Sequence, residues 1–493
     1  CSLNAGAGDG GSQFPTSDGK CWIASVSSPA PITIWGAKGD CTATPCQVGA
    51  TDNLVPVQRA LDYMSANGGF IQIPIDGYGG TFYFSQPLIW TISYGGTTFK
   101  AQNVGIVGPG KLKPSTTLAG VPLTVIGQND PYYIHIDGVG FDLTNVTTSV
   151  LGGILFKGNT HLFIRDNTFN TDNTGSYAAG FYVLGFQDQI FANSGTPPIW
   201  NTISGNSFRP YTGLGITNIP PYCIAMWGQT NATIIYGNAF TQCGDGTGAS
   251  VALLPDLGNG EKSNSVSIYN NWFEASVNSP VAIADIGNPA TNAIVSGTYN
   301  SGTGVTTLIL TNAPPSLAVG STFTVASISP AGCAGLNGLQ TSTVASGTST
   351  TVHFTGPMGL TCTPSGGNFA QYGLLSGATN VYANRVEGQT TFFKIGSTGS
   401  TKSGDQTINP QPYLHDNYMA AVTNYISNSF GNSYSSFEPS CGSFCFAGMN
   451  IITTGSQGLN INVDGSANGL QATGNMTNTA SLNTAPNIRM GSS

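Results

Sequence analysis

Two glutamates, Glu274 and Glu387, have a spacing that suits acid–base chemistry. Each lies three residues beyond a recurring asparagine, in Asn271-Trp-Phe-Glu and Asn384-Arg-Val-Glu. If the repeats stack as coils, the two side chains would occupy equivalent, outward-facing positions on adjacent coils. Cleavage of a glycosidic bond uses two carboxyl groups, about 5–5.5 Å apart for retention or about 6.5–9.5 Å for inversion. Repulsion would keep one group protonated, leaving an acid beside a base, although both could instead be solvated turn residues that point apart.

Asp256 and Asp285 form a rival pair of catalytic carboxylates. They end two similar segments, 250–256 and 280–285, which we align roughly one coil apart. The alternative is that both are turn or capping residues, because aspartate is common in turns.

Aromatic rings in the predicted loops between coils could hold a sugar, because exposed Trp and Tyr rings stack on sugar faces. We predict that Trp200, Trp227, Tyr182 and Tyr211 bind substrate, together with Arg209, which follows a recurring asparagine by three residues. Any single ring could instead be buried in the packing. The partner that these residues imply is a polysaccharide.

Neither a metal nor a cofactor is indicated. The sequence has no Cys-x-x-Cys motif and no Cys/His cluster with the spacing of zinc ligands. Its four histidines are too dispersed to suggest a Ser-His-Asp triad. We therefore expect no metal and no cofactor.

A repeat of about 33 residues would position these side chains. Alternating β-branched residues, a short turn and Asn-x-aromatic recur along the chain, and the successive asparagines are 39, 32, 33, 113 and 33 residues apart. A fixed period with short strands is the signature of a solenoid. Phe169, Phe208, Phe240 and Phe273 should stack inside it. The recurring asparagines are Asn167, Asn206, Asn238, Asn271, Asn384 and Asn417; we expect them at turns, bonding coil to coil.

The separation of 113 residues exceeds one period by 80, which matches a stretch of different pattern at residues 294–373. Its period-two segments predict a small inserted β-barrel or sandwich. We expect this insertion to rise beside Glu274 and Glu387 as the wall of a groove. The chain then divides into a disulfide-stapled segment, a β-helix with a capping helix, the insertion, a β-helix continuation and a C-terminal β segment, at 1–50, 51–293, 294–373, 374–450 and 451–493.

One amphipathic helix is predicted from Pro56 to Ala66. Val57, Ala60, Leu61 and Met64 share a face, and two glycines follow. A helix at this place would cap the open end of the solenoid, where the first coil would otherwise expose its core.

Ten cysteines lie in close sequence pairs, and five local disulfides would suit an oxidising compartment. Sequence alone does not determine the pairing. Cys1 could instead be lipidated, and because the chain begins there we expect a processed, extracellular product. The expected pairs are Cys1–Cys21, Cys41–Cys46, Cys223–Cys243, Cys333–Cys362 and Cys441–Cys445.

The composition narrows the class of protein. Charged residues make up 7% of the 493 residues, against about 25% in an average soluble chain. Long surface helices need such residues on their exposed faces, so a turn-rich all-β protein is expected. The net charge of −8 and the 14 scattered Lys and Arg residues argue against nucleic-acid binding. No apolar stretch approaches the roughly 18 residues of a membrane span.

These features resemble the pectate-lyase-like superfamily of right-handed parallel β-helices, which includes many phage tailspikes. The resemblance covers residues 30–293 and 374–450, and rests on Trp35-Gly-Ala-Lys-Gly-Asp40, the 52–63 helix, the segments 68–74 and 80–83, and the later Asn-x-Phe coils. It implies an extracellular, often trimeric protein that binds or cleaves polysaccharide as a hydrolase or lyase, or a structural part of a virion. Polygalacturonase-like hydrolases carry Gly-His-Gly and an Asn-x-Asp that is followed by an Asp-Asp pair, and we find neither combination here. The basic cluster of a lyase and the calcium-binding carboxylates of pectate lyases are not evident either.

Two hypotheses therefore stand. The first is an extracellular β-helix that binds and cleaves polysaccharide, with its groove along residues 170–290. The second is a non-catalytic structural subunit of an extracellular filament, appendage or virion fibre. In either case we expect a homo-oligomer, either a trimer or a filament.

Overall fold

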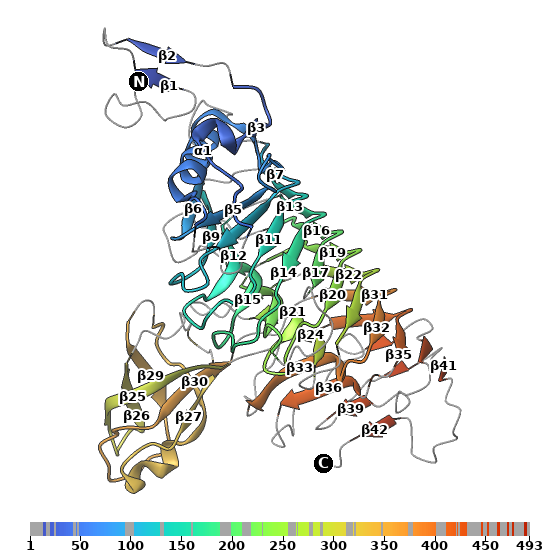
Figure 1. Ribbon diagram of the computed structural model, residues 1–493. Coiled ribbons are helices and arrows are strands. Elements are labelled where there is room, and N and C mark those ends of the chain that lie inside the picture. Colours follow the sequence, from blue (N-terminus) through green and yellow to red (C-terminus); the bar gives the residue numbers. More distant parts are fainter. Residues whose placement is uncertain are drawn as a thin grey trace.

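Three parallel β-sheets, named sheets A, B and C, wind along the chain as a solenoid (Figure 1). Each coil contributes one strand to sheet A, then one to sheet B, then one to sheet C. The predicted all-β parallel β-helix is thereby confirmed. In this computed structural model, the described residues lie mainly between 20 and 430, with gaps that include 94–102, 188–198, 210–217, 255–262, 312–318 and 401–410, and beyond 430 only short strands are described.

The described strands of each sheet follow one another in chain order. Sheet A contains β3 (Ala30–Pro31), β4 (Gly69–Gln72), β7 (Val104–Val107), β10 (Ile134–Asp137), β13 (Leu162–Arg165), β16 (Thr202–Ser204), β19 (Ile234–Tyr236), β22 (Val266–Tyr269), β31 (Ala378–Tyr382), β34 (Gln411–His415), β37 (Cys445–Phe446) and β40 (Gln471–Ala472). Sheet B contains β5 (Thr81–Phe84), β8 (Lys111–Pro114), β11 (Gly140–Asp142), β14 (Thr168–Asn170), β17 (Ser207–Arg209), β20 (Ala239–Thr241), β23 (Trp272–Glu274), β32 (Arg385–Glu387), β35 (Tyr418–Ala420), β38 (Ile451–Ile452) and β41 (Met476–Thr477). Sheet C contains β6 (Leu88–Ser93), β9 (Leu123–Gln128), β12 (Gly152–Lys157), β15 (Tyr182–Gln187), β18 (Tyr222–Trp227), β21 (Ala249–Leu254), β24 (Val281–Asp285), β33 (Thr391–Ser400), β36 (Asn424–Phe430), β39 (Ile461–Val463) and β42 (Ile488–Met490).

A separate antiparallel sheet, sheet D, interrupts the solenoid between β24 and β31 and stands beside it (Figure 1). Its buried residues form a core of their own around Phe323, Phe354 and Phe369. Sheet D is made of β25 (Pro289–Tyr299), β26 (Val305–Leu310), β27 (Thr322–Ala326), β28 (Gly338–Thr341), β29 (Thr351–Thr355) and β30 (Asn368–Tyr372), with the 3-10 helix η5 (Ala331–Leu336) between β27 and β28.

An aromatic column fills the solenoid behind sheet B. Phe169, Phe208, Phe240 and Phe273 are in register on successive strands, and all four are fully buried. Neighbouring rings stack with centroids 4.8–4.9 Å apart, close to the spacing of adjacent strands. The predicted internal ladder of phenylalanines is confirmed.

A buried asparagine ladder runs parallel to this column. The side-chain oxygen of Asn238 accepts hydrogen bonds from the backbone N–H and the Nδ2 of Asn206, at 3.0 and 2.9 Å. Asn238 in turn donates through its own N–H and Nδ2 to the side-chain oxygen of Asn271. The same pattern continues across the insertion, because Asn271 donates to Asn384 at 3.0 Å. The expected bonding from coil to coil is confirmed.

The left-handed turn conformation lies one residue earlier than expected. The residue with positive φ is the one before each asparagine, as in Asp166 (57°), Gly205 (66°) and Ala383 (54°). The turn leaves backbone groups without partners in the β-sheet, and the buried amide of the asparagine provides the missing hydrogen bonds. The sequence pattern located the turn but assigned the strained position to the wrong residue.

The predicted helix forms as α1 (Leu54–Asn67), slightly longer than the Pro56–Ala66 expected. Its buried residues are Val57, Ala60, Leu61 and Met64, the predicted face. These side chains join the solenoid core, and α1 contacts β4, β6 and the 3-10 helix η2 (Ile32–Trp35). The helix ends at Gly68, whose φ of 77° favours glycine.

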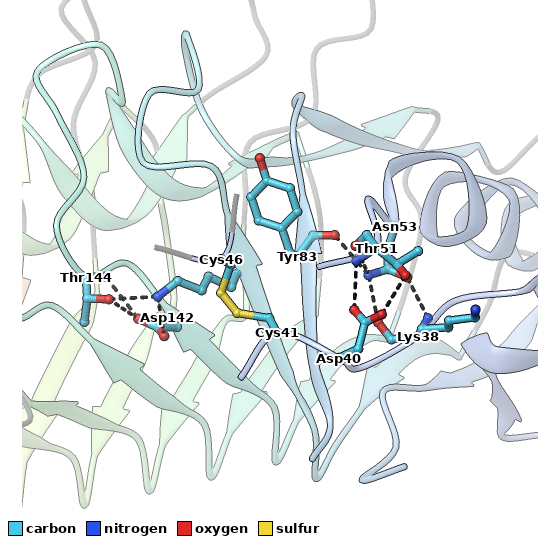
Figure 2. Close-up of a disulfide and its surroundings, with 10 residues drawn as sticks. Lys38, Asp40, Cys41, Cys46, Thr51, Asn53, Tyr83, Asp142 and Thr144 are labelled. Atoms are coloured by element: carbon cyan, nitrogen blue, oxygen red, sulfur yellow. Dashed lines mark hydrogen bonds and ion pairs between the residues drawn. A yellow bond between two sulfur atoms is a disulfide. The ribbon is translucent and has the colours of Figure 1, made fainter. Parts of the chain in front are cut away.

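The segment before α1 is tied to sheet B by side-chain hydrogen bonds (Figure 2). The buried amide of Asn53 donates to the carbonyl oxygens of Lys38 and Tyr83, at 2.9 and 3.1 Å. Asp40 accepts from the N–H and hydroxyl of Thr51, at 2.9 and 2.6 Å. The motif that ends at Asp40 therefore positions the first coil.

Three of the expected disulfides are present: Cys41–Cys46, Cys223–Cys243 and Cys333–Cys362. The first lies beside the Asp40 turn (Figure 2). Cys1 and Cys441 lie outside the described residues, so the pairs Cys1–Cys21 and Cys441–Cys445 stay predictions.

The asparagine ladder should be a major source of stability. Replacing Asn238 by Ala leaves the buried N–H and Nδ2 of Asn206 without their acceptor, which should lower the free energy of unfolding by about 3 kcal/mol. Urea unfolding followed by circular dichroism measures this change. The exposed Asn67 bonds only within its own helix, so N67A should change stability by less than about 0.5 kcal/mol. Equal effects of the two substitutions would contradict a structural role for the ladder.

Candidate functional site

Glu274 and Glu387 lie side by side on sheet B. The register of β23 and β32 pairs Glu274 with Glu387, so the predicted equivalent positions on adjacent coils are confirmed. The preceding residues, Phe273 and Val386, are fully buried in the core, and both glutamates are half-buried on the outer face of the sheet. Strand spacing places their backbones about 4.8 Å apart.

An arginine between two aromatic rings stands on the same face. The guanidinium of Arg385 lies 5.7 Å from the ring of Trp272 on one neighbouring coil and 5.7 Å from the ring of Tyr418 on the other. Such contacts are attractive because the ring face is negative. Trp272 is 43% exposed, so it offers part of its indole to solvent.

Arg385 also forms an ion pair with Glu387, with Nε 2.5 Å from Oε1. The two residues are two positions apart on the strand, so their side chains project from the same face of the sheet. Within the described residues Glu274 forms no such ion pair. The two carboxyl groups therefore sit in different electrostatic surroundings.

A second ion pair in the same outward column has different surroundings. Lys113 Nζ lies 2.7 Å from Asp142 and 2.9 Å from the hydroxyl of Thr144. The Lys113 side chain is 4% exposed, against 61% for Arg385. The Lys113 pair is part of the packing, and the Arg385 group is open to a ligand.

The second predicted pair has the wrong register. Strands β21 and β24 pair Asp285 with Leu253, three residues before Asp256. Asp285 is buried, in register with the inward-facing Leu253, so it faces the core rather than a groove. Asp256 lies outside the described residues. Asp256 and Asp285 are 29 residues apart, whereas the register of β21 and β24 pairs residues that are 32 apart, as in Leu253 and Asp285.

The insertion does not flank the glutamates as expected. It leaves the solenoid after β24 of sheet C and returns at β31 of sheet A, whereas Glu274 and Glu387 end strands of sheet B. The prediction that the insertion forms a groove wall beside these glutamates is therefore wrong about where the insertion leaves the solenoid. Sequence separation indicated which coils the insertion lies between, but not from which side it leaves.

Two predicted sugar-binding rings lie in strands rather than loops. Tyr182 begins β15 and Trp227 ends β18 of sheet C. Tyr182 is 8% exposed, it meets Trp227 edge-on at 5.1 Å, and burial raises the pKa of its hydroxyl. Its ring covers Gly152 and Gly185, where a Cβ would come within 2.5 Å of it. Tyr182 is thus mainly a packing residue, the alternative that the sequence left open.

Of the other predicted substrate-binding residues, the structure describes Trp200 fully and Arg209 only in its backbone. Trp200 is 51% exposed beside sheet A, and its ring lies tilted against that of His161, with centroids 4.7 Å apart. Arg209 ends β17, but its side chain lies outside the described residues, as does all of Tyr211. Trp200 and the glutamates belong to different sheets, so they form no single site.

The sequence analysis missed Trp272, Arg385 and Tyr418. Each directly follows a recurring asparagine, and each faces outward because the next residue faces inward. The signal was available in the sequence: the first residue after successive recurring asparagines is Trp272, Arg385 and Tyr418.

The described residues contain neither a metal-binding cluster nor a membrane-spanning helix. Among the described residues, no group of three His, Cys, Asp or Glu side chains gathers as a metal site would require. In that same part of the chain, no helix has the length and apolar character needed to span a membrane.

The two ion pairs on sheet B should differ in their effect on stability. Lys113→Met leaves a largely buried Asp142 without its counter-charge and should lower the free energy of unfolding by about 2–3 kcal/mol. Arg385→Met removes an exposed pair and should cost less than about 1 kcal/mol. Urea unfolding at neutral pH measures both. A larger loss of stability for Arg385→Met than for Lys113→Met would show that Arg385 mainly stabilises the fold.

Comparison with known proteins gives likenesses of structure alone. No sequence model of a known protein family matches the chain, and no curated protein matches it. An alginate lyase from Paenibacillus sp. str. FPU-7 aligns with a TM-score of 0.40 and 10% identity, over 85% of this chain and 96% of the lyase. A tailspike double mutant of E. coli bacteriophage HK620 aligns with a TM-score of 0.43 and 11% identity, over 95% of this chain and 71% of the tailspike.

The enzymatically active domain of tailspike protein 2 from bacteriophage CBA120 aligns with a TM-score of 0.40 and 10% identity, over 94% of this chain. The chain spans 55% of that domain. At these TM-scores the likenesses assign neither residues nor a substrate. The strand order and the register show by themselves that this chain is a parallel β-helix, the fold that its resemblance to the pectate-lyase-like superfamily implied.

Proposed function

We propose that the protein binds a polysaccharide on the outer face of sheet B and cleaves it with Glu274 and Glu387. The observation that carries this proposal is the pairing of two glutamates on adjacent strands beside an exposed tryptophan. Trp272 offers a flat apolar surface of the kind that sugar rings stack on. A chain with few charges suits hydroxyl-rich ligands that are held by hydrogen bonds and stacking.

The different surroundings of the two carboxyl groups suggest their roles. Glu387, which is held by its ion pair with Arg385, attacks the anomeric carbon while Glu274 donates a proton to the departing glycosidic oxygen. Water then adds to the same carbon, Glu274 takes the proton from that water, and Glu387 is released. Side chains that extend in parallel from backbones about 4.8 Å apart would hold their carboxyl groups near the roughly 5–5.5 Å separation of retaining enzymes. We therefore propose a retaining hydrolase.

The test is E274Q, which keeps the size and hydrogen bonds of the side chain but cannot donate the proton. Release of reducing ends from dextran, xylan, galactomannan, polygalacturonate and alginate should fall by at least about 100-fold on the polymer that wild type cleaves. Proton NMR of the first product should show retained configuration. The exposed carboxylate of Asp62, on helix α1, provides the matched control D62N, which should leave the rate unchanged.

Binding is tested separately. W272A should weaken binding to the same polymer by about tenfold, whereas E274Q should leave binding nearly intact. Cleavage retained in E274Q would refute the roles of the glutamates. If no polymer is cleaved but one binds, the protein is a lectin-like binder. If none binds, polysaccharide recognition is wrong as well.

A second proposal, the non-catalytic filament or virion subunit, is favoured by exposed apolar residues along sheet A. Ile234 and Tyr236 are both more than one-third exposed, next to the exposed Trp200. Contact with another copy would cover them, giving a homo-oligomer. The three disulfides support an extracellular or virion setting.

Sedimentation velocity tests this self-association. Wild type should sediment as a trimer or larger assembly, and I234S combined with Y236S should shift it toward monomer. The control is V55S, at an apolar residue on helix α1 that is more exposed than Ile234 or Tyr236. A monomeric wild type at high concentration would contradict the proposal.

A further inference from the structure

A pocket of about 450 Å³ opens where three successive turns lead from sheet B to sheet C. Residues 176–180, 218–222 and 245–247 line it, so each of three coils contributes one wall. The volume falls within the roughly 300–1,000 Å³ typical of small-molecule sites. The pocket shares no lining residue with the Glu274 group.

The walls of the pocket are held in place. The Cys223–Cys243 disulfide joins the coil that carries Tyr222 to the coil that carries Asp245. Asp245 is itself fixed, because one of its oxygens accepts from the N–H and the hydroxyl of Thr247, at 2.9 and 2.6 Å. The N–H of Gly248 also donates to that oxygen, at 3.2 Å. The pocket is therefore preorganised rather than shaped by its ligand.

The second carboxylate oxygen of Asp245 remains an acceptor. Within the described residues it accepts no hydrogen bond, while the first oxygen holds the turn. Asp245 is also the one charged residue among the described residues that line the pocket. The pocket thus presents a strong acceptor with no cation to balance it.

Two tyrosines complete the lining. The hydroxyl of Tyr177 donates to the carbonyl oxygen of Thr171, which fixes its ring at the pocket wall. Burial and the nearby charge of Asp245 raise the pKa of Tyr222, so its hydroxyl stays protonated and can donate. Aromatic walls, hydroxyl groups and a fixed carboxylate are the groups that bind a sugar through its faces and its hydroxyls.

The pocket lies along the same edge of the solenoid as the glutamates. Its Asp245 turn follows β20, and Thr241 at the end of β20 pairs with Glu274 on the next coil. The other two walls belong to the two preceding coils. The pocket therefore begins about 5 Å along the axis from Glu274 and extends to roughly 15 Å. One polysaccharide chain lying along the axis could reach both places.

We infer that this pocket is a subsite that holds one uncharged sugar residue of the polysaccharide, with Asp245 accepting hydrogen bonds from its hydroxyl groups. The inference rests on the proposed function and narrows its substrate class. A uronic acid or sulfated sugar would place its negative charge against Asp245, with no cation among the described residues that line the pocket, so the pocket selects against acidic residues.

The test compares neutral and acidic probes on one variant. D245N keeps the amide oxygen that holds the Thr247 turn but removes the charge. Isothermal titration uses cellohexaose, maltohexaose, mannohexaose and xylohexaose as neutral probes, and hexagalacturonate and an alginate hexamer as acidic probes. We expect D245N to bind the preferred neutral probe about tenfold more weakly and the acidic probes more tightly, most clearly at low salt. D166N makes the same change at an exposed turn outside the pocket and should alter neither.

Each outcome has a separate meaning. If a neutral probe binds and D245N binds it equally well, the subsite is refuted while the proposed function stands. If wild type prefers the acidic probes, the predicted selectivity is refuted. If none of the probes binds to wild type, D245N or W272A, the proposed function fails together with the subsite. If D245N unfolds at the same temperature as wild type, misfolding of the variant is excluded as the cause of any change in binding.

Discussion

The hydrogen bonds that each coil makes to the next are the constraint on which this structure depends. A turn between two strands removes backbone groups from the ladder, and the buried asparagines supply replacements. Because Asn271 bonds to Asn384, 113 residues later, the ladder also holds the coils in register across the insertion. The stacked phenylalanines fill the space beside it and add burial of apolar surface.

This register turns a linear repeat into columns of side chains. Any residue type that appears at the same repeat position on adjacent coils is brought within one strand spacing. On sheet B one outward column pairs Lys113 with Asp142, and further along it pairs Glu274 with Glu387. The first pair is neutralised and buried. The second is an acidic pair in which, among the described residues, Glu387 is bonded to Arg385 and Glu274 forms no ion pair.

Low charge and loop placement together shape the surface. With 36 charged residues in the chain, each carboxylate that faces a pocket or an exposed ring has few neighbours that could screen it. The Asp245 pocket and the Glu274 pair lie along one edge because both follow the ends of sheet B strands. A ligand running along the axis would meet stacking surfaces and carboxylates in turn, which favours a hydroxyl-rich polymer over a charged one.

The sequence by itself determined the repeat, the inward phenylalanines, the asparagine ladder, the buried face of α1 and the pairing of Glu274 with Glu387, because each follows from local spacing. Only the tertiary structure decided that Asp285 faces the core opposite Leu253, that Tyr182 is packing, and that the insertion leaves from sheet C. It also brought Arg385 between Trp272 and Tyr418 and built the Asp245 pocket from three separate turns. The period of a repeat predicts which residues are equivalent on successive coils. The direction of a side chain after a loop depends on the length of that loop and on where the loop packs. The spacing of the repeat contains neither piece of information.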